Sequence, residues 1–180
     1  MKEEIIISGF GGQGVLSMGK LLAYAAMMEA KEVSWLPAYG PEQRGGTANC
    51  TVIVSDNKIP SPIISHYTTA ILLNQPSIEK FMPAVKSGGT LIYDTSGIIA
   101  PPTNDDLEIY SINAMDAAAE MKNIKTFNMI VLGGLIKIKP IVSIENIAKA
   151  LHKTLPERHH KLIPINEEAL RRGFDIIKKD

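Results

Sequence analysis

The chain has 180 residues, and its 19 basic side chains balance its 19 acidic ones. This length suits one domain with a sizeable core, so we expect residues 1–180 to form a single domain. The neutral balance gives no indication of binding to nucleic acid or to an anionic membrane. A single cysteine, Cys50, excludes an internal disulfide and a Cys-rich zinc or iron–sulfur site within the chain. No signal-like segment follows Met1 and no apolar run is long enough to cross a bilayer, so we expect a cytoplasmic protein.

Segments with strand-like and helical hydrophobic patterns alternate along the chain. Ile5-Ile6-Ile7 is β-branched throughout, as expected of a parallel strand buried on both faces, and a helical pattern follows from Val15 to about Ala30. The further segments predicted as strands are 32–36, 47–55, 70–73, 90–93 and 107–112; those predicted as helices are 77–86, 114–121, 127–137, 143–152 and 164–178. This alternation predicts an α/β fold, a three-layer domain with a mostly parallel sheet and helices on both faces.

A glycine-rich turn, Gly9-x-Gly11-x-x-Gly14, follows the first predicted strand and opens the first predicted helix. Backbone N–H groups at such a helix start offer an anion site, and the spacing is that of a dinucleotide-binding turn. However, the second predicted strand ends in Ser34-Trp35-Leu36-Pro37, without the carboxylate that holds the ribose of a nicotinamide cofactor. A phosphate or carboxylate therefore fits the turn better than a whole dinucleotide, and a tight turn that needs glycine only for packing is the alternative. The candidate cofactor-binding residues here are Gly9, Gly11, Gly12, Gln13 and Gly14.

A second unusual segment, 35–50, joins two predicted strands and has the sequence WLPAYGPEQRGGTANC. Its prolines and glycines specify the backbone path tightly, because proline fixes φ and glycine permits positive φ or close approach. Arg44 beside a glycine pair suits an anion or a partner's carboxylate, since its planar guanidinium can bind either one in bidentate fashion. An internal ion pair between Arg44 and Glu42 is the alternative. The candidate residues for contacting a partner or an anion are Tyr39, Gly40, Pro41, Glu42, Gln43, Arg44, Gly45, Gly46, Thr47 and Asn49.

The remaining polar residues do not make a self-sufficient active site. Asp94 is expected at the carboxyl edge of the sheet, where it could line a crevice or form an Asx-turn. Asn128, at the start of an apolar helix, is either a cap or an interface contact. Cys50 lies in a strand pattern and is expected to be buried and inert. The pair His159-His160 has no carboxylate or cysteine at ligand spacing. We therefore expect no catalytic residue and no metal ligand in this chain.

Two motifs together resemble one family: Gly9-Phe10-Gly11-Gly12-Gln13-Gly14-Val15, and the segment AYGPEQRGGTANC at 38–50. They are similar to the gamma subunit of 2-oxoacid:ferredoxin oxidoreductases, in particular the 2-oxoglutarate and 2-oxoisovalerate types. The segment Phe127-Asn128-Met129 and the closing part from Pro164 to Gly173 also resemble the family, so the resemblance covers essentially the whole chain.

The resemblance implies a Rossmann-like subunit of a heteromeric, cytoplasmic complex that converts a 2-oxoacid, with 2-oxoglutarate expected, to acyl-CoA and passes electrons to ferredoxin. It implies that alpha and beta subunits hold thiamine diphosphate, and that 4Fe–4S clusters lie in beta and, where present, a delta subunit. The present chain would build the complex and border the entry of coenzyme A, without binding a cofactor of its own. The alternative is a stand-alone nucleotide- or CoA-binding Rossmann-like protein.

Overall fold

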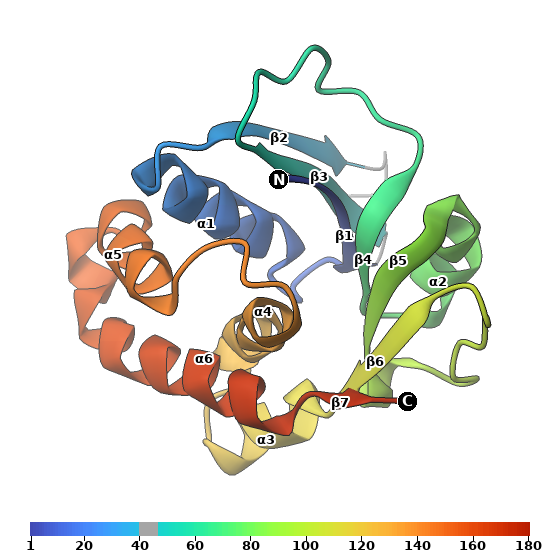
Figure 1. Cartoon of the computed structure of the whole chain (residues 1–180). Helices are drawn as coiled ribbons and strands as arrows, with labels where there is room; N and C mark the ends of the chain where they lie inside the picture. The colour runs from blue at the N-terminus through green and yellow to red at the C-terminus, as the bar shows by residue number, and fades with distance from the viewer. Residues whose placement is uncertain (40–46) are drawn as a thin grey trace.

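The computed structural model describes residues 1–39 and 47–180, apart from the side chain of Tyr39. This part of the chain folds into a seven-stranded sheet in the order β2-β3-β1-β4-β5-β6-β7, with helices packed against it (Figure 1). The strands are β1 (Lys2–Phe10), β2 (Glu32–Tyr39), β3 (Thr47–Ser55), β4 (Tyr67–Leu72), β5 (Val85–Asp94), β6 (Glu108–Ile112) and β7 (Lys178–Lys179). The helices are α1 (Val15–Met28), α2 (Gln75–Phe81), α3 (Ala114–Glu120), α4 (Phe127–Ile138), α5 (Ile144–Thr154) and α6 (Ile163–Ile176).

The centre of the sheet is parallel and its margins are antiparallel. Strands β1, β4, β5 and β6 run in the same direction, whereas β3 is antiparallel to both β1 and β2, and β7 is antiparallel to β6. Only residues 40–46 separate β2 from β3. A parallel neighbour would need a crossover of about a dozen residues or more, so the short connection explains the antiparallel pairing.

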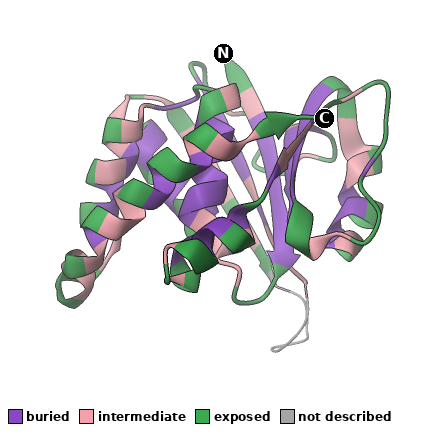
Figure 2. Ribbon diagram, turned by 90° about the horizontal axis from the view of Figure 1, so that it is seen from below, coloured by how far each residue is buried: buried purple, intermediate pink, exposed green. Residues whose placement is uncertain are grey.

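Helices cover both faces of the sheet, as predicted. Along β1 the side chains alternate: Ile5 and Ile7 enter the larger hydrophobic core, which contains side chains of α1, α3, α4, α5 and α6. Ile6 faces the other way, into a smaller core with Ile78 and Phe81 of α2. The period-two alternation of a strand thus places one sheet between two helical layers. In Figure 2 the strands of the sheet are largely buried.

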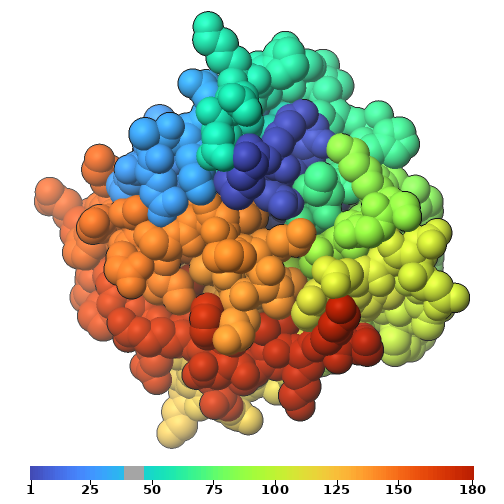
Figure 3. Space-filling model, in the orientation of Figure 1, coloured from blue at the N-terminus to red at the C-terminus, as the bar shows by residue number. Residues whose placement is uncertain are grey.

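One helix pair of the larger layer, α4 and α6, approaches at two points without side chains between the helices. A Cβ atom added at Gly133 of α4 would lie 1.9 Å from the carbonyl oxygen of Leu170 in α6, and one added at Gly173 would lie 1.7 Å from that of Ile130. The two backbones are therefore in direct contact, and this contact fixes α6 across α4. Figure 3 shows the outer surface of this layer, with α5 and α6 in orange to red, and the segment 56–66 projecting in teal at the rim.

The ends of two predicted helices were wrong. The helix predicted over 77–86 ends at Phe81, because a short 3-10 turn containing Pro83 follows, and Val85 and Lys86 already belong to β5. Proline lacks the N–H that continued helix would require. The last helix ends at Ile176, and the chain then forms the unpredicted strand β7 on β6.

The side chain of Asp180, directly after β7, holds this unpredicted strand in place. Tyr93 Oη donates to Asp180 Oδ2 at 2.7 Å, and Ser111 Oγ donates to Asp180 Oδ1 at 2.5 Å.

None of the helices in the described part of the chain has the length and apolar character that crossing a membrane requires.

Candidate functional site

The two motifs singled out in the sequence meet at the carboxyl edge of the parallel strands. Phe10, the last residue of β1, pairs in register with Thr47, the first residue of β3, and Gly9 pairs with Ala48. On the next strand Tyr39 pairs with Ala48. The glycine turn after β1 and the two strand ends that flank 40–46 therefore lie side by side (Figure 1). This edge is where ligands bind in open α/β sheets.

The glycine turn has backbone conformations that favour glycine. Gly12 has φ 97° and Gly14, the residue before α1, has φ 74°. A Cβ atom at Gly14 would also lie 2.6 Å from Nδ2 of Asn128, whereas one at Gly12 would meet nothing within 4 Å. Gly14 is thus constrained by conformation and by contact, and Gly12 by conformation alone. Both the anion-site and the packing interpretation of the turn use this geometry.

The side chain of Gln13 makes hydrogen bonds within the glycine turn and to the neighbouring strand. Its Oε1 accepts a hydrogen bond from the backbone N–H of Phe10 at 2.6 Å, and its Nε2 donates to the carbonyl of Leu73, after β4, at 3.3 Å. The side chain therefore fastens the turn to the neighbouring strand. Any ligand at the turn would meet the exposed backbone of Gly11 and Gly12, rather than this amide.

The described part of the second motif contributes Thr47 and Asn49. Their neighbours Ala48 and Cys50 pack in the larger core on the α1 side, so Thr47 and Asn49 lie on the opposite face, which α2 covers. Asn49 pairs in register with Ser8 of β1. The candidates Gly40, Pro41, Glu42, Gln43, Arg44, Gly45 and Gly46, the side chain of Tyr39, and with them the possible Arg44–Glu42 pair, lie outside the described residues.

Sequence reasoning missed a polar group between these elements. Ser8 Oγ lies 2.8 Å from Ser77 Oγ of α2, and both hydroxyls are buried. Beside them Asn74, two residues beyond the end of β4, accepts a hydrogen bond from the backbone N–H of Ser77 through its Oδ1 at 2.9 Å. The Nδ2 of this fully buried asparagine has no hydrogen-bond partner among the described residues. The available signal was a polar residue directly after a short buried strand.

The structure gives Asp94 a structural role and excludes a capping role for Asn128. Asp94 is fully buried and accepts hydrogen bonds from the backbone N–H groups of Ser96, Ala114 and Met115 at 3.2, 2.8 and 3.2 Å. It forms the turn after β5 and caps α3, so it does not line a crevice. Asn128 does not cap α4; it lies half-buried against Gly14.

The described residues offer little reactive chemistry. Burial raises the pKa of the Cys50 thiol to about 12, and its Sγ donates to the carbonyl of Val15 at 3.6 Å, so it is a buried, inert thiol as predicted. Among the residues of 1–39 and 47–180, no three His, Cys, Asp or Glu side chains gather as a metal site would require.

The topology also argues against a nicotinamide site. In a dinucleotide-binding unit the second strand lies next to the first, and its terminal carboxylate reaches the ribose. Here β3 separates β2 from β1. Both the missing carboxylate and the strand order therefore distinguish this turn from a nicotinamide-binding one.

Comparison with known proteins agrees with this fold. The family model "Pyruvate ferredoxin/flavodoxin oxidoreductase" matches residues 4–176. The chain is 37% identical over 178 residues to ketoisovalerate oxidoreductase subunit VorA of Methanothermobacter marburgensis, covering 98% of this chain and 37% of that protein. The chain thus spans well under half the length of that relative.

Two solved structures share the fold over nearly the whole chain. The gamma subunit of a keto/oxoacid ferredoxin oxidoreductase from Geobacter sulfurreducens superposes with a TM-score of 0.84 at 27% identity, covering 98% of this chain and 96% of that one. The 2-oxoglutarate:ferredoxin oxidoreductase of Magnetococcus marinus, solved with 2-oxoglutarate, coenzyme A and succinyl-CoA, gives 0.86 at 25% identity, covering 96% of this chain and 30% of that one. The chain belongs to the pyruvate ferredoxin/flavodoxin oxidoreductase family, which confirms the resemblance found in its glycine turn and its second motif.

Proposed function

We propose that this chain is the gamma subunit of a 2-oxoacid:ferredoxin oxidoreductase. The complex oxidatively decarboxylates a 2-oxoacid to acyl-CoA and reduces ferredoxin in the cytoplasm, with 2-oxoglutarate as the expected substrate. The observation that carries the proposal is the meeting of the glycine turn and the second motif at one sheet edge, in a chain that matches a solved gamma subunit over 98% of its length. This chain supplies a docking and ligand-bordering surface, and residues 1–180 act as one domain.

The chemistry of the chain supports a division of labour among subunits. One buried cysteine cannot supply the four thiolates that a 4Fe–4S cluster takes. We place those clusters and thiamine diphosphate on the alpha, beta and, where present, delta subunits. Thiamine diphosphate supplies the carbanion stabilisation that decarboxylation needs. The present chain orients the partner surfaces, and its Gly11–Gly12 backbone and segment 39–49 border the side from which coenzyme A enters.

Co-expression with the alpha and beta subunits tests the assignment. We expect a stable complex that reduces a viologen dye only when a 2-oxoacid, coenzyme A and thiamine diphosphate are all present. A chain that purifies alone, beside a complex with full activity without it, would contradict the proposal. Micromolar affinity of the isolated chain for NADH or FAD would instead support the stand-alone nucleotide-binding alternative.

The substrate needs its own measurement. The relative named for ketoisovalerate favours a branched-chain 2-oxoacid as a second candidate, and the structure solved with 2-oxoglutarate favours the first. The ratio of kcat/KM for 2-oxoglutarate, 2-oxoisovalerate and pyruvate in the purified complex decides between them. We expect 2-oxoglutarate to give the highest value; a higher value for 2-oxoisovalerate would reverse the assignment.

Arg44 is the proposed electrostatic anchor of the second motif. We expect Arg44→Ala to weaken assembly of the complex or to raise the KM for coenzyme A about tenfold, because a charge-assisted hydrogen bond contributes roughly 1.5–3 kcal/mol. The thermal midpoint of the isolated chain should not change. Arg171→Ala is the matched control, since Arg171 lies on α6 with its side chain 69% exposed. Equal assembly and equal KM values for the two variants would support an internal structural role for Arg44.

A further inference from the structure

A hollow opens among the helices. Neither the glycine turn nor the strand ends that flank 40–46 line it. It has a volume of about 890 Å³ and is lined by residues of α1, α4, α5 and α6 and by the short turns Ile124–Thr126 and Glu157–Leu162. Ligand pockets for small molecules usually measure about 300–1,000 Å³. The hollow is therefore large enough for a nucleotide-sized ligand.

The charged side chains that line the hollow are all basic. Lys20 comes from α1, Lys122 follows α3 and Lys125 lies in the turn before α4, whereas no Asp or Glu lines the hollow. Within the described part of the chain none of these lysines is in an ion pair, although Lys20 also contacts the ring of Tyr24. Lys20, Lys122 and Lys125 line one space to which no carboxylate contributes, and their positive charges create a local positive potential that attracts an anion.

The rear of the hollow is apolar. Leu21, Met129 and Leu151 line it and are at most 4% exposed, so they form a fixed hydrophobic surface. A small inorganic anion would gain nothing from these side chains, whereas a ligand with an organic part would also bury apolar area against Ile124, which lines the same hollow and is 53% exposed. The combination of a basic rim and an apolar rear thus selects an anion that carries an organic group.

Asn128 links the hollow to the glycine turn. Its side chain lines the hollow and also approaches Gly14. It makes no hydrogen bond to any other described residue, so its amide is a free donor and acceptor at the mouth of the hollow. Because Gly14 has no side chain, Asn128 keeps this position at the start of α4.

We propose that this hollow binds an organic phosphate, with Lys20, Lys122 and Lys125 around the phosphate groups and Leu21, Met129 and Leu151 against the organic part. Lysine ammonium groups bind phosphate as point charges and need no fork geometry. This inference does not rest on the proposed function, because the ligand is tested on the chain alone. It assigns a role to a basic surface that would otherwise serve only for solvation.

Titration calorimetry of the 180-residue chain with ADP tests the proposal. We expect Lys20→Ala and Lys125→Ala each to weaken ADP binding about tenfold, which corresponds to the roughly 1.4 kcal/mol of one charge-assisted contact. Ser17→Trp, at an exposed lining position of α1, should block binding by filling the mouth without touching the core. Lys58→Ala is the control, since Lys58 follows β3 at the opposite edge of the sheet.

Several results would overturn the proposal. Equal loss of ADP affinity in Lys58→Ala and in the two cavity variants would indicate non-specific binding to lysines and would refute a defined site. Absence of ADP binding up to millimolar concentration would also refute it. Pyrophosphate binding as tightly as ADP would show that the apolar rear contributes nothing, and would overturn an organic-phosphate site.

Competition identifies the source of the phosphate. If coenzyme A displaces ADP from the wild-type chain and loses this ability in Lys125→Ala, the hollow accepts the nucleotide end of the coenzyme. If ADP stays bound in the presence of excess coenzyme A, the hollow accepts a separate nucleotide. Both results support an organic-phosphate site, and the viologen assay of the complex remains an independent test of the proposed function.

Discussion

Gly12 and Gly14 lie two residues apart and both have positive φ, at 97° and 74°, but their surroundings differ. The added Cβ of Gly14 would lie within 2.6 to 2.9 Å of three Asn128 atoms, while Gly12 borders open space. The sequence predicted glycines at a tight turn, and this is confirmed. It did not predict that Gln13 would join the turn to Leu73, because a contact across 60 positions leaves no trace in local pattern.

Alanine substitutions should distinguish the two glycines by their effect on the free energy of unfolding. We expect Gly12→Ala to lower the free energy of unfolding by about 1–2 kcal/mol, the cost of a side chain at positive φ. Gly14→Ala should cost about 1–3 kcal/mol more, because its methyl group also overlaps Asn128. Urea unfolding of both variants measures the difference. The double variant Gly14→Ala with Asn128→Ala should recover part of the extra loss; no recovery would show that the Asn128 contact is not the cause.

At the scale of the elements, the types of strand and helix were predictable from the sequence and the structure largely confirms them, but the strand order was not predictable. The apolar pattern of 127–137 predicted a buried helix, and most residues of α4 are buried. Nothing in the local pattern of 47–55 distinguishes an antiparallel strand beside β1 from a parallel one, because both faces are covered in either case. The length of the 40–46 connection was the one available signal.

The crossing of α4 and α6 gives a prediction about packing. We expect Gly133→Ala to lower the free energy of unfolding by about 3 kcal/mol or more, because its methyl group would meet the backbone carbonyl of Leu170 at 1.9 Å and must separate the helices. Gly134→Ala is the control, since its methyl group would meet only the flexible ends of Ile112 and Ile177 at 2.8 and 3.0 Å. Chemical denaturation should show a far smaller loss for this control. Equal losses would indicate that the helices are free to move apart.

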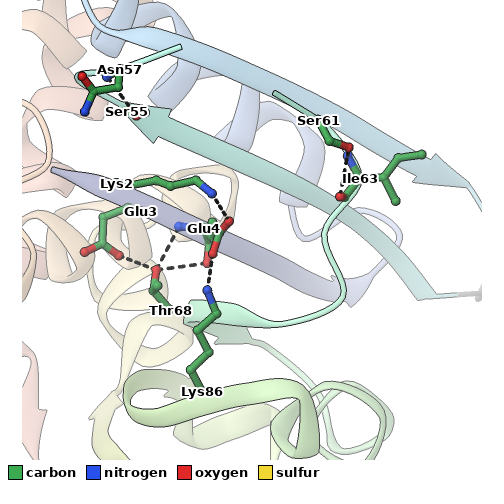
Figure 4. Close-up of polar contacts among 9 residues, drawn as sticks. All are labelled: Lys2, Glu3, Glu4, Ser55, Asn57, Ser61, Ile63, Thr68 and Lys86. Atoms are coloured by element: carbon green, nitrogen blue, oxygen red, sulfur yellow. Dashed lines mark hydrogen bonds and ion pairs between the residues drawn. The ribbon is translucent and has the colours of Figure 1, made fainter. Parts of the chain in front are cut away.

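For the molecule as a whole, the amino edge of the sheet is fastened by charge. Glu4 of β1 receives hydrogen bonds from Lys2, at 2.5 Å, and from Lys86 of β5 (Figure 4). Beside it Glu3 accepts from the hydroxyl of Thr68 at 2.7 Å. Burial by itself would raise the pKa of Glu4, but the two lysines outweigh it and the pKa lies below its ordinary value. The network ties the first strand to its neighbours on one side.

This network predicts a loss of stability in acid. A carboxyl group with a lowered pKa in the folded state contributes stability above its unfolded pKa and loses it as the pH falls through the folded pKa. The free energy of unfolding should therefore fall as the pH decreases from about 5 toward 3. Glu4→Gln should flatten this dependence, and Glu168→Gln, at an exposed position of α6, should not. Parallel pH profiles for Glu4→Gln and the wild type would exclude Glu4 as the cause.

The positions of the two chain ends determine where a further polypeptide could be joined to this fold. Lys2 begins β1 at the amino edge, and β7 runs back from the carboxyl edge so that the backbone N–H of Asp180 bonds to Ile109. Figure 2 shows both ends on the same side of the sheet. A polypeptide joined to either end would leave from that side and would not have to cross the edge where the glycine turn lies. The same architecture can therefore serve as a separate chain or as one segment of a longer chain, with the edge that carries the glycine turn left open in both.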